Sequence, residues 1–243
     1  MANALMVAPL VLAGLGLAAG IWWWFRHRNR LPEIVVWNAS ATRILLEEHE
    51  YTLGFHERRL AVLMRLAKRL PAKRREKILG EAGRSTDCLE EYRAAIEENQ
   101  ERETIAEPGR SLLRSRQLAT GEGMLDLSRR LGQWYGKHSR HDKLRNLARD
   151  LEVVLARAPM IHDYFHWRLV LSHLAERTQD IPAHRIVSLR LADRGSALHQ
   201  EAETFFKLIR SPGIKTPVVR RSARALRCKL ARFARSVLNA RAV

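Results

Sequence analysis

Two histidines stand four residues apart at His162 and His166, with Asp163 beside the first and His173 further along. On an α-helix, residues four apart share a face, so the two imidazoles could chelate a metal ion. No glutamate follows His162 as an HExxH zinc motif requires. Helical histidines that bond backbone or water are the commoner case, so we expect no bound metal. A metal-dependent enzyme that uses His162 and His166 stays open as an alternative.

Paired carboxylates offer a second kind of chemistry, general acid–base catalysis, at Glu90 and Glu91 and again at Glu97 and Glu98. They belong to the run EEYRAAIEENQERE, whose dense charge indicates a solvated helix face, where the pKa of a carboxyl group is seldom tuned for catalysis. The sequence has no P-loop, GxGxxG, GxSxG or kinase motif. We therefore predict that the protein is not an enzyme and needs no cofactor.

The C-terminal segment from Pro217 onward is rich in arginine and contains no acidic residue. Apolar residues recur there at steps of three and four, which predicts a helix with one narrow apolar stripe: Val219, Ala223, Leu226, Leu230, Phe233 and Val237. The predicted anionic-surface residues surround this stripe: Arg220, Arg221, Arg224, Arg227, Lys229, Arg232, Arg235 and Arg241. This pattern is typical of a helix on anionic lipid, where each cation contributes about 1 kcal/mol.

Two alternatives remain for this basic helix. Its stripe could dock on the rest of the fold and leave the arginines solvated, although a docked helix usually carries some acidic residues too. It could also bind nucleic acid, but it lacks interleaved aromatic residues beyond Phe233, and no helix-turn-helix pattern precedes it. We expect contact with anionic headgroups because a membrane anchor is predicted upstream.

That anchor is an uncharged run from Ala4 to Phe25, which spans about 33 Å at about 1.5 Å per residue and so could cross a bilayer. An aromatic belt and a cationic stop close it: Trp22, Trp23, Trp24, Arg26, Arg28 and Arg30. A cleaved signal peptide would instead carry its charges first and end in small residues. Because positive flanks stay inside, we predict a single-pass membrane protein with its N-terminus outside and residues 26–243 in the cytoplasm.

Gly16 and Gly20 form a GxxxG motif within the predicted span. The spacing lets two transmembrane helices approach closely, so these glycines are candidates for helix–helix contact and homo-oligomerisation. The motif is short and common, and the alternative is that the glycines simply lie in a lipid-facing helix.

The elements that position these groups are helical throughout. Apolar spacing predicts helices over residues 45–70, 72–105, 125–136, 142–174 with a kink at Pro159, and 186–209. We expect breaks at Glu107-Pro108-Gly109 and at Thr120-Gly121-Glu122-Gly123, and we find no alternating strand pattern. The predicted class is all-α: one transmembrane helix, an antiparallel bundle of about four long helices, and the basic amphipathic helix. The predicted domains are residues 1–30, 31–210 and 211–243.

Composition limits the partners. The chain has 243 residues and a formal net charge of +17, which favours polyanions such as lipid headgroups, nucleic acid or an acidic protein. Its two cysteines, Cys88 and Cys228, have no CxxC spacing, so we expect free thiols in a reducing compartment.

One segment of the chain, YFHWRLVLSHLAERTQDIPAHRIVSLRL, resembles the last helix of the LemA family. That family carries spaced tyrosine–asparagine pairs, a phenylalanine–proline step and an apolar run. Ile181-Pro182 and Ile186-Val187 fall where the step and the run would be. The chain departs from the pattern at Trp167 and Leu174, which replace tyrosines, and at Arg168 and Ala175, which replace asparagines.

Two upstream segments extend the resemblance over about residues 40–190. RNLARDLEVVL is similar to the family's leucine- and glutamate-rich stretch, with Leu147, Leu151 and Glu152 at matching positions, and FHERRLAVLMRLAKRLPAKRREKIL resembles its paired-basic first helix. The resemblance implies a membrane-anchored antiparallel bundle of no established activity, from a family of which one branch serves magnetosome membrane formation. No catalytic residue is implied. We therefore expect a membrane-anchored scaffold that contacts anionic lipid and other proteins, with nucleic acid the less favoured partner.

Overall fold

The computed structural model describes residues 35–241, and every regular element in this range is a helix. The helices are α2 (Ala39–Lys68), α3 (Ala72–Gln100), α4 (Glu107–His138), α5 (Asp142–Leu155), α6 (Pro159–Thr178), α7 (Ala183–Ser188), α8 (Leu191–Arg210) and α9 (Thr216–Arg241). The all-α class is confirmed. The predicted span with its tryptophans, arginines and glycines lies outside the described residues. Among the helices that are described, none combines the length and apolarity needed to cross a bilayer.

The start of α2 is set by Asn38, whose side chain accepts a hydrogen bond from the backbone N–H of Ala41 at 2.9 Å. Such a cap satisfies a donor that the first helical turn leaves free. Pro71 follows the end of α2 and precedes α3, as expected from its fixed φ and missing N–H. The first predicted helix boundary is therefore close to the observed one.

Of the two predicted helix breaks, the one at residues 107–109 lies at the boundary between α3 and α4, whereas the one at residues 120–123 is wrong. Residues 120–123 lie in the middle of α4, and residues 107–109 form its first turn, where a proline loses no hydrogen bond. Glycine in a helix interior costs about 1 kcal/mol. The buried packing of Leu113, Met124 and Leu131 along the same helix outweighs this cost.

The predicted kinked helix over residues 142–174 is instead two helices, α5 and α6. Residues 156–158 separate them, and Arg157 in this turn is 0% exposed. Its guanidinium donates to the carbonyl oxygen of Ser211 at 2.9 Å and to Oγ1 of Thr216 at 3.1 Å, and also to the carbonyl of Ile214. A buried arginine thus joins the α5–α6 turn to the turn between α8 and α9.

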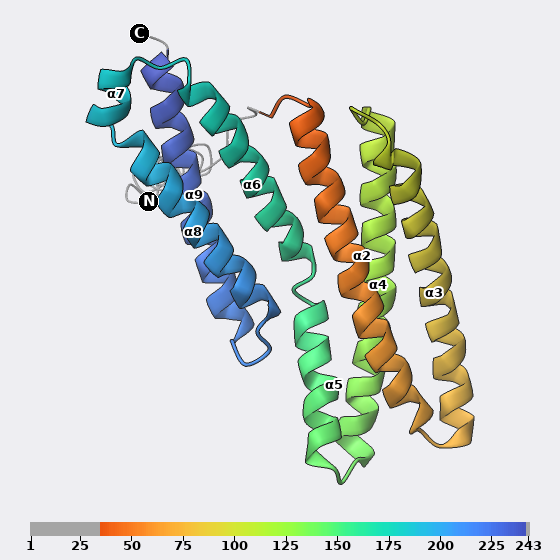
Figure 1. Ribbon diagram of the computed structural model, residues 1–243. Helices are drawn as coiled ribbons and strands as arrows, with labels where there is room; N and C mark the ends of the chain where they lie inside the picture. Colours follow the sequence, from red (N-terminus) through yellow and green to blue (C-terminus); the bar gives the residue numbers. More distant parts are fainter. Residues whose placement is uncertain (1–34, 242–243) are drawn as a thin grey trace, which may run out of the picture.

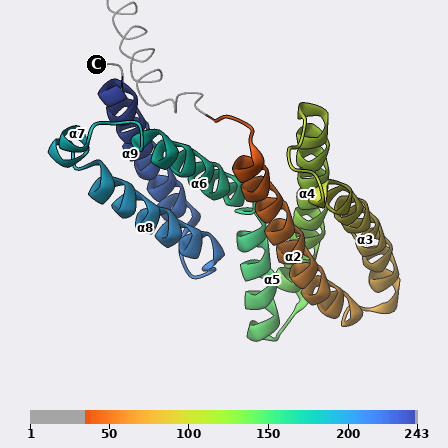
Figure 2. The ribbon, with the colours of Figure 1, turned by 45° about the horizontal axis from the view of Figure 1, so that its top comes forward.

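The helices form two groups that lie side by side (Figure 1). In one group α2, α3, α4 and α5 pack together, and in the other α6, α8 and α9 pack together, with α6 also contacting α2. One apolar core continues through both groups, and a smaller one lies between α2, α3 and the start of α4. The views in Figures 1 and 2 place α7, the C-terminal end of α9 and the start of α2 at the same end of the molecule.

Candidate anionic-surface interface

Helix α9 carries the arginine-rich segment and packs against α8 and α6. The predicted apolar stripe is buried, with Val219 and Leu230 at 0% exposure and Val237 at 1%. These side chains fill the core and are not free to enter a lipid layer. The alternative that the apolar stripe packs on the rest of the fold is therefore confirmed. Helix α9 belongs to the bundle and does not form a separate tail.

The cations of α9 stay at the surface, because a helix that buries one stripe turns its remaining positions outward. Exposed members of the predicted set are Arg220, Arg221, Arg224, Arg227, Lys229, Arg232 and Arg241, whereas Arg235 is half-buried. Lys229 pairs with Glu201 at 2.6 Å and Arg241 with Asp180 at 3.3 Å. Within residues 35–241, no ion pair involves Arg220, Arg221 or Arg224. The outer face of α9 therefore presents uncompensated positive charge.

Some of the exposed large apolar side chains lie at the end of the molecule where the described chain begins. Val36 is 58% exposed and Trp37 38%, while Val187 in α7 is 75% exposed. The Val36 segment is held in place because Nε2 of His173 lies 2.7 Å from its carbonyl oxygen. Figures 1 and 2 show that the start of the described chain, α7 and the C-terminus of α9 all lie at this end.

A wide hollow of about 690 Å³ lies between α2, α6 and α8, with α9 at its edge. Its floor is apolar, with Ile44, Leu171 and Leu191 at 9%, 8% and 1% exposure. Arg168 and Glu47 pair at its rim at 2.6 Å. An apolar floor with a charged rim is the composition of many protein interaction sites.

The structure brings His162 and His166 together on α6, with ring centroids 6.1 Å apart. His173 is not part of this pair, because its Nδ1 and Nε2 lie 3.1 Å and 2.7 Å from the carbonyl oxygens of Leu169 and Val36. Nδ1 of His162 instead lies 2.9 Å from Oε1 of Glu48 on α2. Among residues 35–241, no group of three or more histidine, cysteine, aspartate or glutamate side chains is arranged to hold a metal ion.

Glu48 is the residue that sequence reasoning missed. Its side chain is 3% exposed and accepts a hydrogen bond from Nε2 of Gln117 at 3.1 Å, with the Arg114 guanidinium at 3.9 Å. Burial alone would raise the pKa of this carboxyl group, but the hydrogen bond and charge of His162 lower it below the ordinary value. The available signal was a glutamate on the face of α2 that also carries Leu45, Thr52 and Phe55.

Two further buried histidines lie on α2. Nδ1 of His49 is 2.6 Å from the hydroxyl of Tyr92, and Nδ1 of His56 has no hydrogen-bond partner. Burial lowers the pKa of each to about 4. Both imidazoles are therefore neutral at physiological pH.

The paired carboxylates lie on a solvent-exposed helix face, as the charge density of their segment predicts. Glu90, Glu91, Glu97 and Glu98 are all exposed on α3. Glu98 pairs with Arg102 at 2.9 Å, and Glu91 pairs with Arg116 of α4. The solvated face is confirmed. Both cysteines, Cys88 and Cys228, are free and half-buried, as expected.

Comparisons with known proteins give no relative from which a role could be taken. No family model, curated protein or solved structure matches the chain.

Proposed function

We propose that the protein is a membrane-tethered helical scaffold whose basic α9 face binds anionic headgroups and whose bundle holds other proteins near the membrane. The observation that carries this proposal is the arrangement of α9, which buries its apolar stripe and leaves an acid-free row of cations outside. Each cation near an anionic surface contributes about 1 kcal/mol. The lipid contact in this proposal is electrostatic and involves no insertion of α9.

The predicted tether supports this assignment. If residues 4–25 cross the membrane, residues 26–34 connect the span to Val35 with a greatest reach of about 30 Å. The bundle can then lean until the α9 face meets the headgroups. Two linked attachments reinforce each other, because the second binding event becomes intramolecular. The resemblance to the LemA family and the cytoplasmic placement stay predictions beside this proposal.

The test uses full-length protein in vesicles that contain a headgroup-labelled nitroxide lipid, with a fluorophore at the exposed position Ala225→Cys of α9. Cys88→Ser and Cys228→Ser remove the natural thiols. We expect stronger quenching in vesicles with phosphatidylglycerol than in phosphatidylcholine alone, and weaker quenching as salt rises. The triple variant Arg221→Gln/Arg224→Gln/Arg232→Gln should lose about 3 kcal/mol and with it the anionic-lipid difference.

The matched control is Arg65→Gln/Arg75→Gln/Arg84→Gln, which removes the same charge from exposed positions on α2 and α3. It should retain the quenching. Equal quenching in both lipids, unchanged by the α9 triple variant, would contradict the proposal. Retention of nucleic acid on filters by the intact protein, lost in the α9 variant, would favour the alternative of a membrane-tethered nucleic-acid-binding protein.

A further inference from the structure

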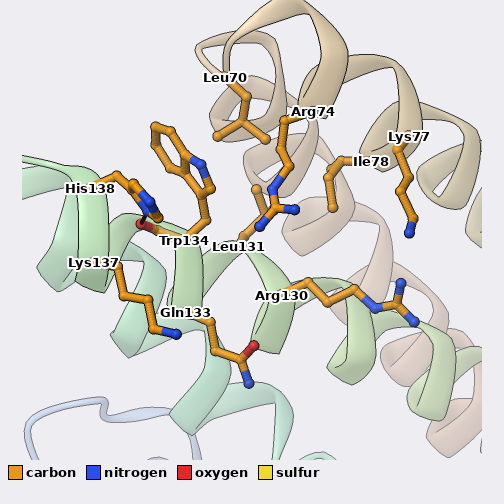
Figure 3. A pocket seen from close by; sticks show the side chains of 10 residues that line it. All are labelled: Leu70, Arg74, Lys77, Ile78, Arg130, Leu131, Gln133, Trp134, Lys137 and His138. Carbon is orange, nitrogen blue, oxygen red and sulfur yellow. Dashed lines mark hydrogen bonds between the residues drawn. The ribbon is translucent and has the colours of Figure 1, made fainter.

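A hollow of about 310 Å³ opens between the first half of α3 and the last turns of α4 (Figure 3). Its floor is apolar, formed by Leu70, Ile78 and Leu131, which are 4%, 6% and 0% exposed. This size lies at the lower end of small-molecule sites, which measure about 300–1,000 Å³. The hollow can therefore enclose a molecule of several rings or functional groups.

The indole of Trp134 forms one wall. Its ring stacks on His138 with centroids 5.3 Å apart and an interplanar angle of 16°. In Figure 3, His138 lies on one side of the indole, and Leu131 and Arg74 lie on the other. Trp134 is half-buried, and the ring of His138 covers one of its faces. The wall is an aromatic surface on which a planar ring could lie.

Cations line the rest of the hollow. Arg74 and Lys77 project from successive turns of α3, and Lys137 comes from α4. Within the described part of the chain no ion pair involves any of these three, and no aspartate or glutamate lines the hollow. Arg130 also lines it, but its guanidinium pairs with Glu81 at 2.5 Å. In Figure 3 the Arg74 guanidinium lies nearest the indole, and Lys77 and Lys137 lie on opposite sides of this guanidinium, so these cations line the hollow without a carboxylate among them.

We propose that this hollow binds a dissolved organic phosphate with a planar ring, the ring against Trp134 and the phosphate at the Arg74 guanidinium, with Lys77 and Lys137 on either side. A doubly charged phosphate has the acceptor oxygens that guanidinium and ammonium groups bind most strongly. The apolar floor and the indole suit a ring and give inorganic phosphate nothing to contact. The hollow lies at the turn between α2 and α3, the end opposite to α7 and the C-terminus of α9 (Figure 1). Since that opposite end carries the tether in the proposed function, a dissolved ligand fits the site better than a lipid headgroup.

The test is calorimetric titration of the full-length protein in zwitterionic nanodiscs, with adenosine monophosphate and inorganic phosphate as probes. We expect adenosine monophosphate to bind at least tenfold more tightly than inorganic phosphate. Arg74→Gln/Lys77→Gln should weaken binding of both probes at least tenfold. The control Lys73→Gln/Arg75→Gln removes two neighbouring exposed cations outside this hollow and should stay within twofold.

A second pair of variants separates the ring from the phosphate. Trp134→Leu should weaken only adenosine monophosphate, and Trp134→Phe should restore most of its affinity; circular dichroism checks that both stay helical. Absence of binding by adenosine monophosphate would overturn the proposal, as would equal losses in the two double variants. Binding only to vesicles that contain phosphatidic acid would also overturn it, because the ligand would then be a lipid phosphate. Since none of these variants touches α9, failure here leaves the lipid-surface proposal intact.

Discussion

The two groups of helices bury different kinds of side chain. Of the twelve buried polar or charged side chains among residues 35–241, ten belong to α2, α3 and α4. The group of α6, α8 and α9 is filled instead by aromatic rings, such as Tyr164 stacked on Phe206 with centroids 4.1 Å apart. A polar interior keeps its stability only while its hydrogen bonds and charge states persist. The stability of an apolar interior does not depend on charge states. The packing beneath the strongly charged outer face of α9 should therefore be insensitive to pH.

The largest effect expected from this difference is a loss of stability in mild acid. His49 and His56 have a folded pKa of about 4 against an ordinary value of 6.5, so the unfolded chain takes up protons first as the pH falls. Stability is full above about pH 6.5 and declines until about pH 4, by about 3 kcal/mol for each histidine. Urea unfolding of full-length protein in detergent micelles, followed by circular dichroism between pH 7 and pH 4, measures this decline.

His56→Phe sharpens that experiment, because it removes the buried imidazole whose Nδ1 has no partner. The variant should show about half the pH-dependent loss. A stability curve that is flat over this range, or unchanged by the variant, would contradict the neutral buried state of these histidines.

The next effect concerns the apolar group. Leu230 is 0% exposed in the stripe of α9, so Leu230→Ala should lower the free energy of unfolding by about 2–5 kcal/mol. Arg224→Ala, on the exposed face of the same helix, should stay within about 0.5 kcal/mol. Similar small effects for both would mean that α9 does not pack through this stripe. Unlike the histidine effect, the cost of Leu230→Ala should not change between pH 7 and pH 5.

The smallest effect concerns Glu48. Glu48→Ala leaves Gln117 and His162 without their shared acceptor, which should cost about 1–3 kcal/mol at pH 7. The adjacent Glu47→Ala breaks an exposed pair with Arg168 and should cost at most about 1 kcal/mol.

The same comparison has a pH signature. Because the folded pKa of Glu48 is lowered from 4.5, its contribution is present above about pH 4.5 and is lost as the pH falls through the folded value. The difference in free energy of unfolding between the wild-type protein and Glu48→Ala should therefore become smaller in acid. If this difference in free energy does not change with pH, Glu48 is not ionised in the folded protein.

Much of the fold could be predicted from the spacing of the apolar residues and from the positions of the prolines. Pro71 marks the boundary between α2 and α3, and the stripe from Val219 to Val237 predicts helix α9 and which of its faces is apolar. Local signals failed at Gly121 and Gly123, because packing within the bundle outweighs glycine's helix penalty. They also failed to show that α9 docks, because docking depends on the apolar surfaces of α6 and α8, which lie elsewhere in the sequence.

The candidate sites were predicted less well. The α9 cations are visible in the sequence, since their exposure follows from the helical period. The contact of Glu48 with His162 joins residues of α2 and α6, and the hollow beside Trp134 joins α3 to α4. No spacing within one segment shows which helices become neighbours, so both needed the tertiary structure.

A membrane-tethered scaffold must behave as an integral membrane protein, and alkaline extraction measures this property. Native membranes would be washed with alkaline carbonate and then with detergent, and the protein followed in the pellet and the supernatant. If residues 4–25 span the membrane, the protein should stay in the pellet through carbonate and be released only by detergent, with its N-terminus still upstream of Ala4. Release by carbonate, or a mature chain that begins beyond Phe25, would contradict this prediction.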